Sequence, residues 1–167
     1  LLLQKKSYKV LAELAAHHDG WASAQMAPLS EAMSEALPAC APACKGKRIA
    51  CLQAVAAALP PAQLSELLPS LLGEIVLATK EVNVKTRAAA FDFLVGLAEG
   101  AERRAPGGPQ EKAAVVRDFL VMVAAGLAGN TPHMMAASLS ALGRLTYQFR
   151  DREALLPTSV QLLSTVT

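Results

Sequence analysis

One pattern of polar and apolar positions occurs four times along the chain. A long or polar residue is followed three positions later by a small residue, then at once by a large apolar residue, and an aliphatic residue comes three positions further on. This spacing places all four positions on one face of a helix. The large apolar positions, which we expect to be core anchors, are Tyr8, Leu52, Phe91 and Leu139.

The spacing of these anchors predicts a repeat architecture. Successive anchors are 44, 39 and 48 residues apart, which is about the length of a two-helix HEAT or armadillo repeat. Prolines recur in apolar helical stretches at Pro28, Pro69 and Pro157, at separations of 41 and 88 residues. A proline inside a helix removes a backbone donor and bends the helix, so we expect bends at a fixed phase of the repeat.

Capping residues and helix breakers predict about eight antiparallel helices in four helix-pair units. We expect them at residues 2–16, 22–37, 45–59, 62–79, 83–99, 111–128, 131–149 and 152–166, with Asn83 and either Asn130 or Thr131 as N-caps. Residues 100–110 are predicted to form a projecting loop. The predicted fold is an all-α, HEAT/armadillo-like α-solenoid over residues 1–167, as one segment of a longer repeat protein whose further repeats would cover apolar faces at both ends.

Composition supports close-packed helices. Hydrophobic residues make up 53% of the chain but aromatic residues only 4%. No apolar run reaches the ~18 residues of a membrane span. The net charge of +2 is far from that of a free-standing nucleic-acid-binding domain, so the placement of the charges is more informative than their sum.

Basic residues gather near the helix starts of successive units, and we expect them to form a ridge along one edge. The cationic side chains and the helix N-termini would attract an RNA backbone or an acidic protein segment. The alternative is that these residues only solvate the edge, with the stems of Arg48 and Arg87 packed between repeats. The ridge consists of Lys5, Lys6, Lys9, Lys45, Lys47, Arg48, Lys80, Lys85 and Arg87; Arg103 and Arg104 are a candidate contact on the loop.

The sequence gives little indication of a metal site or of a catalytic site. Cys40 and Cys44 with His17-His18 are wrongly spaced for a compact zinc site, and Cys51 is expected to pack as a small apolar residue. His18-Asp19 has no nucleophile elbow near any serine. Trp21, the single tryptophan, is either a hydrophobic staple at a helix start or an exposed anchor for a partner. We therefore expect no catalytic residue, metal site or cofactor.

Four stretches resemble a known family. Residues 3–14, 47–52, 74–91 and 124–150 are similar, in order, to a part of the ribosomal-RNA-processing-protein-twelve family, and the stretch around Lys80 is the most specific. The family's proteins are several times longer than this chain.

The resemblance implies a non-catalytic HEAT-repeat scaffold of ribosome biogenesis in the nucleus and nucleolus, with shuttling to the cytoplasm as a further option. It implies association with pre-ribosomal RNA, assembly factors and nuclear transport factors, and a role in small-subunit maturation and subunit export. From the residues themselves we expect neither a membrane nor a small-molecule substrate as partner. The repeat pattern alone is equally consistent with other HEAT-repeat proteins, such as a karyopherin-like transport receptor or a signalling adaptor. An enzyme would instead show a deep pocket with converging titratable groups.

Overall fold

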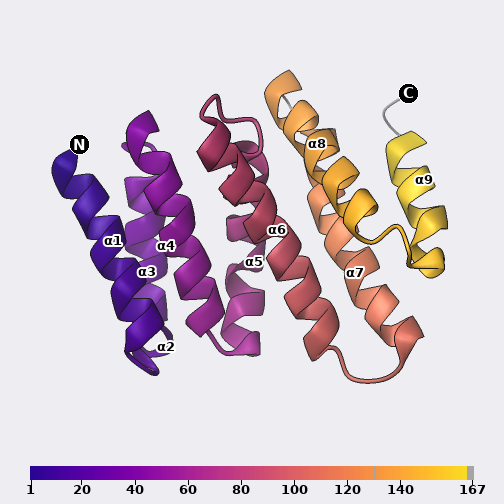
Figure 1. The fold of residues 1–167 in the computed structure, drawn as a ribbon, viewed down its shortest axis with the longest axis horizontal. Helices are drawn as coiled ribbons and strands as arrows, with labels where there is room; N and C mark the ends of the chain where they lie inside the picture. The colour runs from indigo at the N-terminus through magenta and orange to yellow at the C-terminus, as the bar shows by residue number, and fades with distance from the viewer. Residues whose placement is uncertain (130, 165–167) are drawn as a thin grey trace. The chain divides into compact units, whose positions relative to one another are not determined.

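A computed structural model describes residues 1–129 and 131–164, and every regular element in them is helical (Figure 1). The all-α prediction is confirmed. The α-helices are α1 (Leu2–His17), α2 (Trp21–Ala24), α3 (Met26–Ala36), α4 (Lys45–Ala58), α5 (Pro61–Ala78), α6 (Val84–Arg104), α7 (Pro109–Ala124), α8 (Pro132–Gln148) and α9 (Leu156–Ser164). Short 3-10 helices are η1 (Pro42–Cys44), η2 (Ala125–Ala128) and η3 (Glu153–Leu155).

The chain divides into two compact units, Leu1–Leu71 and Leu72–Thr167, with the boundary inside α5. In the first unit α1 and α4 lie side by side (Figure 1). The core of this unit contains Tyr8 of α1, Met33 of α3 and Ile49 of α4, each at most 7% exposed. Burying these side chains supplies the main favourable free energy of folding in the unit.

The second unit packs α6, α7 and α8 against one another, and α9 contacts α7 and α8. Figure 1 shows α6 and α7 running in opposite directions from the short connection between them. Leu94 of α6, Phe119 and Leu120 of α7, and Leu145 of α8 are essentially inaccessible to solvent. The buried positions of α7 recur at spacings of three or four, as an amphipathic helix requires: Ala113, Val116, Phe119 or Leu120, and Val123.

Helix starts were well predicted where a capping residue marks them. The Asn83 side chain accepts hydrogen bonds from the backbone N–H groups of Lys85 at 3.0 Å and Thr86 at 3.1 Å. The Thr131 hydroxyl accepts from the N–H of Met134 at 3.2 Å, so Thr131 is the N-cap of α8. The alternative cap, Asn130, lies outside the described residues, as do residues 165 and 166 of the last predicted helix.

The predicted helix at 22–37 is interrupted at Gln25, which separates α2 from α3. The cause is Pro28, which has no N–H for the Ala24 carbonyl and whose ring crowds that carbonyl. The described residues therefore contain nine α-helices where eight were expected. Pro69 stands inside α5, whereas Pro157 is the second residue of α9, a first-turn position at which a proline removes no helical hydrogen bond.

The loop predicted at 100–110 is also shorter than expected. Helix α6 continues to Arg104 and α7 begins at Pro109, so only residues 105–108 connect them. Residues 101–104 are Ala, Glu, Arg and Arg, all good helix formers, and the two arginines favour the negative end of the helix dipole. Gly107 has a φ of 94°, a left-handed conformation that suits glycine.

Two of the four predicted anchors are not core residues. Tyr8 and Leu52 are buried, but Phe91 is half-buried and Leu139 is 38% exposed. In α8 the buried positions are Ala137, Ser138, Ala141, Leu142 and Leu145. The fourth copy of the pattern therefore presents a different face to the core from the one predicted.

No helix within residues 1–129 and 131–164 is both long enough and apolar enough to cross a membrane.

Candidate functional site

The first turns of α1 and α4 lie together in the first unit. The Gln4 side chain donates to the Ala39 carbonyl at 3.0 Å and accepts from the Ala41 N–H at 3.1 Å. The Cys44 thiol, just before α4, lies 3.7 Å from the Leu1 carbonyl. These contacts join two helix N-termini, each with a partial positive charge.

The same turns carry five lysines, which we call the α1–α4 basic patch: Lys5, Lys6, Lys9, Lys45 and Lys47. Lys6, Lys9 and Lys47 are exposed, and the other two are half-buried. Glu13 is the one acidic residue of α1, and α4 has none. The two helices thus place cationic side chains beside one another, with Glu13 as their single acidic residue.

Arg48 belongs to the predicted ridge, but the structure buries it. Its side chain is 2% exposed and donates from Nη1 to the Tyr8 hydroxyl at 3.2 Å and from Nη2 to the Met33 carbonyl at 2.8 Å. The guanidinium carbon also lies 5.7 Å from the centre of the Tyr8 ring. Arg48 therefore links α1, α3 and α4, and its prediction as a surface contact was wrong.

The remaining ridge residues, Lys80, Lys85 and Arg87, lie around the α5–α6 turn of the second unit. Lys80 and Lys85 are exposed. The half-buried Arg87 donates from Nη1 to the Glu81 carbonyl at 2.9 Å, which braces the turn. One continuous ridge through both units stays a prediction.

Arg103 and Arg104, predicted on a loop, are exposed residues in the last turn of α6. A Cβ atom at Gly100 would lie 3.2 Å from Nη1 of Arg104, so the Arg104 side chain folds back along its own helix. The two arginines are thus carried by a regular helix end, which fixes their backbone more firmly than a loop would.

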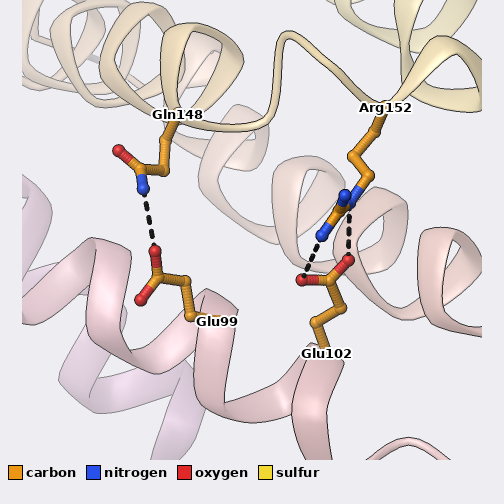
Figure 2. Close-up of polar contacts among 4 residues, drawn as sticks. All are labelled: Glu99, Glu102, Gln148 and Arg152. Atoms are coloured by element: carbon orange, nitrogen blue, oxygen red, sulfur yellow. Dashed lines mark hydrogen bonds and ion pairs between the residues drawn. The ribbon is translucent and has the colours of Figure 1, made fainter.

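A polar cluster that the sequence did not indicate joins α6 to the end of α8 and to the segment that follows it (Figure 2). Gln148 donates to Glu99 at 2.8 Å, and Arg152 forms two bonds with Glu102, at 2.9 and 3.4 Å. The Glu102 carboxylate raises the pKa of Arg152. Glu99 and Glu102 are three positions apart in the sequence, and Gln148 and Arg152 are four apart. No sequence pattern, however, pairs residues that are about 50 positions apart.

Histidine, cysteine and acidic side chains form no metal-binding cluster in the described ranges, 1–129 and 131–164. No three His, Cys, Asp or Glu side chains there gather as metal ligands. Cys44 and Cys51 are buried, Cys40 is half-buried, and all three are free thiols. Burial raises the pKa of Cys51 to about 11, so Cys51 packs as a small apolar residue, as predicted.

No family model matches the chain. The chain is 34% identical to an RRP12-like protein of Gallus gallus over 89% of its own length, and 32% identical to an RRP12-like protein of Homo sapiens over 89%. It is 24% identical over 90% of its length to ribosomal RNA-processing protein 12 of Saccharomyces cerevisiae. The chain spans only 11–13% of the length of these relatives. Over most of its length, this chain matches a segment of the ribosomal RNA-processing protein 12 family.

Proposed function

We propose that this chain takes part in ribosomal RNA processing during ribosome biogenesis, as a non-catalytic scaffold in the nucleus and nucleolus. The observation that carries the proposal is the similarity to ribosomal RNA-processing protein 12 and RRP12-like proteins over about nine-tenths of the chain. Its partners would be pre-ribosomal RNA and assembly factors, with transport factors for the export of ribosomal subunits.

The proposed architecture is a HEAT/armadillo-like solenoid over residues 1–167. The helix order supports four pairs, with α2 and α3 together as the second helix of the first pair and α4–α5, α6–α7 and α8–α9 as the others. Stacked helix pairs offer an extended surface on which several modest contacts add up to a stable association. Such a surface suits a protein that holds partners together without chemistry of its own.

RNA is the proposed ligand of the α1–α4 basic patch. Lysine side chains and helix N-termini attract phosphate groups without reading base sequence. No aromatic residue other than the buried Tyr8 lies in α1 or α4, so base stacking would contribute little and the binding would be mainly electrostatic. Arg103 and Arg104 at the end of α6 are proposed as a further contact.

Reversal of exposed lysines in the patch tests this ligand. We expect the Lys6→Glu/Lys9→Glu/Lys47→Glu variant to bind single-stranded RNA more weakly, and the slope of log K against log salt to flatten by about 2, since three phosphate contacts are lost at about 0.7 each. Fluorescence anisotropy with a labelled uridine oligonucleotide measures both quantities. Arg48 is left unchanged because it is buried.

A matched variant, Lys112→Glu/Arg117→Glu/Arg144→Glu, makes the same change in net charge outside the patch. We expect it to lower affinity much less than the patch variant. Equal losses in the two variants, or an unchanged slope in the patch variant with its helical content intact, would contradict the assignment of RNA to this patch.

A further inference from the structure

All four residues drawn in Figure 2 line one cavity of about 360 Å³ in the second unit. Apart from Phe149, every side chain that lines this cavity is charged or carries an amide group. They are the acidic residues Glu99, Glu102 and Asp151, the arginines Arg103 and Arg152, and Gln148. Pockets for small-molecule ligands are mostly apolar, so this cavity suits a charged group instead.

The two carboxylates that α6 contributes lie one turn apart but have different partners (Figure 2). Glu102, whose side chain is 13% exposed, accepts two hydrogen bonds from the cationic Arg152, at 2.9 and 3.4 Å. The half-buried Glu99 accepts one bond, at 2.8 Å, from the neutral amide of Gln148. Figure 2 shows the second carboxylate oxygen of Glu99 turned away from Gln148.

Glu99 therefore lacks the positive partner that Glu102 has. Within residues 1–129 and 131–164 no Lys, Arg or His forms an ion pair with the Glu99 carboxylate. A carboxylate that is partly removed from water loses favourable hydration, and a cation nearby restores most of this loss. The free oxygen of Glu99 is thus a binding position for a cation that this part of the chain does not supply.

The balance of charge around the cavity also favours a cation. Three carboxylates and two guanidinium groups line it, which leaves one net negative charge. Glu102 and Arg152 neutralise each other, so Glu99 and Asp151 stand against the exposed Arg103. A cation that enters would be attracted by two unpaired carboxylates, whereas an anion would be repelled by them.

The cavity lies at helix ends and not along helix sides. Glu99 and Glu102 lie near the end of α6, which is at Arg104, and Gln148 is the last residue of α8. In the proposed solenoid each helix pair contacts its neighbours through helix sides. Further repeats of a longer protein would therefore leave this edge open, and loops at such an edge commonly carry binding residues.

We propose that this cavity binds an arginine side chain of a partner protein, whose guanidinium group donates hydrogen bonds to Glu99 and Asp151. The bonds from Arg152 to Glu102 are an example, in the same cavity, of a guanidinium group paired with a carboxylate of α6. Arginine fits better than lysine because its planar fork can donate to two oxygens at once. The site shares no residue with the α1–α4 basic patch and does not depend on the proposed role in RNA processing.

Two short peptides, blocked at both ends, test the requirement for charge. One has a central arginine and the other a central citrulline, which has nearly the same shape but no charge. Heteronuclear NMR of the chain follows the side-chain amide of Gln148, which lines the cavity. We expect the arginine peptide to shift this signal and to bind at least about tenfold more tightly than the citrulline peptide, because hydrogen bonds between ionised groups are the strong ones.

Three variants locate the binding. Glu99→Gln keeps the shape of the side chain and its bond with Gln148 but removes the charge, and we expect it to weaken binding of the arginine peptide about tenfold. Asp151→Asn, at an exposed position after α8, should weaken it about two- to fivefold. Glu31→Gln makes the same change in net charge at an exposed position of the first unit and should leave the affinity unchanged.

The outcomes that would overturn the proposal are equally definite. Equal affinities for the two peptides would show that charge is not recognised. Full affinity in Asp151→Asn together with full affinity in Glu99→Gln, or a loss in Glu31→Gln as large as theirs, would place binding elsewhere. A Gln148 shift produced by inorganic phosphate at lower concentration than by the arginine peptide would assign the cavity to an anion, held by Arg103.

Discussion

Arg48 is a charged side chain held in the core of the first unit. A buried charge is tolerated only when its hydrogen-bonding groups are satisfied, and Arg48 donates to the Tyr8 hydroxyl and to the Met33 carbonyl. Because these partners lie in α1 and α3 while Arg48 lies in α4, the guanidinium fixes the mutual placement of three helices. Its role is structural, although its position in the sequence resembled that of the surface lysines.

Truncation of Arg48 should therefore affect stability. We expect Arg48→Ala to lower the free energy of unfolding by about 2–4 kcal/mol, since it leaves a cavity and a buried carbonyl without its donor. Arg48→Met should cost less, because an apolar side chain of similar length fills the space and removes the buried charge. Urea unfolding followed by circular dichroism measures both losses; equal losses, or none, would contradict a buried structural role.

The Cys51 thiol should make stability depend on pH in the alkaline range. In the unfolded chain the thiol ionises around its ordinary pKa of 9.0, but burial raises the folded-state pKa to about 11. The contribution of Cys51 is therefore fully present below pH 9 and is lost as the pH rises towards 11. We expect the stability of the native chain to fall relative to Cys51→Ala by about 1 kcal/mol between pH 8 and pH 10.

Tyr8 acts in the same direction, because burial raises its pKa as well. The comparison with Cys51→Ala cancels this contribution, since Tyr8 is present in both chains. Denaturant unfolding at pH 8, 9 and 10 gives the difference. Parallel pH profiles for the two chains would contradict the assignment to Cys51.

At the scale of elements, η2 approaches α8 very closely at Gly126. A Cβ atom there would collide with Ser138 Oγ and lie 3.3 Å from Ser138 Cβ. Ser138 is fully buried, and its hydroxyl has no hydrogen-bond partner within the described part of the chain. The contact thus requires a residue without a side chain at position 126, and it buries a hydroxyl group that forms no hydrogen bond.

A double-mutant cycle tests this contact. We expect Gly126→Ala to lower the free energy of unfolding by about 1–3 kcal/mol through crowding. Ser138→Ala alone should be neutral or stabilising by up to about 1 kcal/mol, because it removes an unsatisfied buried hydroxyl. In the double variant the cost of Gly126→Ala should shrink, giving a coupling of at least about 0.5 kcal/mol; strictly additive effects in thermal and urea unfolding would contradict this account of the contact.

Helix positions were predictable from the sequence wherever a local rule decides them. The helices expected at 45–59 and 62–79 are found at Lys45–Ala58 and Pro61–Ala78. Helix boundaries were predicted wrongly where two local preferences conflict. Gly100 suggested the start of a loop, but the good helix formers that follow it extend α6 to Arg104. Periodicity likewise identified α8 but not its buried face, which is set by packing against η2 and α7.

The candidate sites were less predictable than the helices, because they depend on contacts between distant residues. Sequence spacing placed Arg48 with its lysine neighbours, and only the packing of α1 on α4 shows that it points inwards. The bonds between Glu102 and Arg152 likewise join residues that no local sequence pattern connects.

For the whole molecule, the repeated helical pattern and the similarity to a longer family lead to the same proposal. The proposed scaffold role comes from the order of helix pairs, and the proposed role in ribosomal RNA processing comes from the similarity to ribosomal RNA-processing protein 12. Within this proposal, the α1–α4 basic patch is the surface assigned to RNA.

The measurement that tests the central claim most directly is depletion of the protein in the cells that make it, followed by gel analysis of ribosomal RNA precursors and mature species. The account predicts that precursors accumulate and mature ribosomal RNA falls, and that re-expression of the protein restores processing. Normal levels of ribosomal RNA precursors and of mature ribosomal RNA after complete depletion would contradict a role in ribosomal RNA processing.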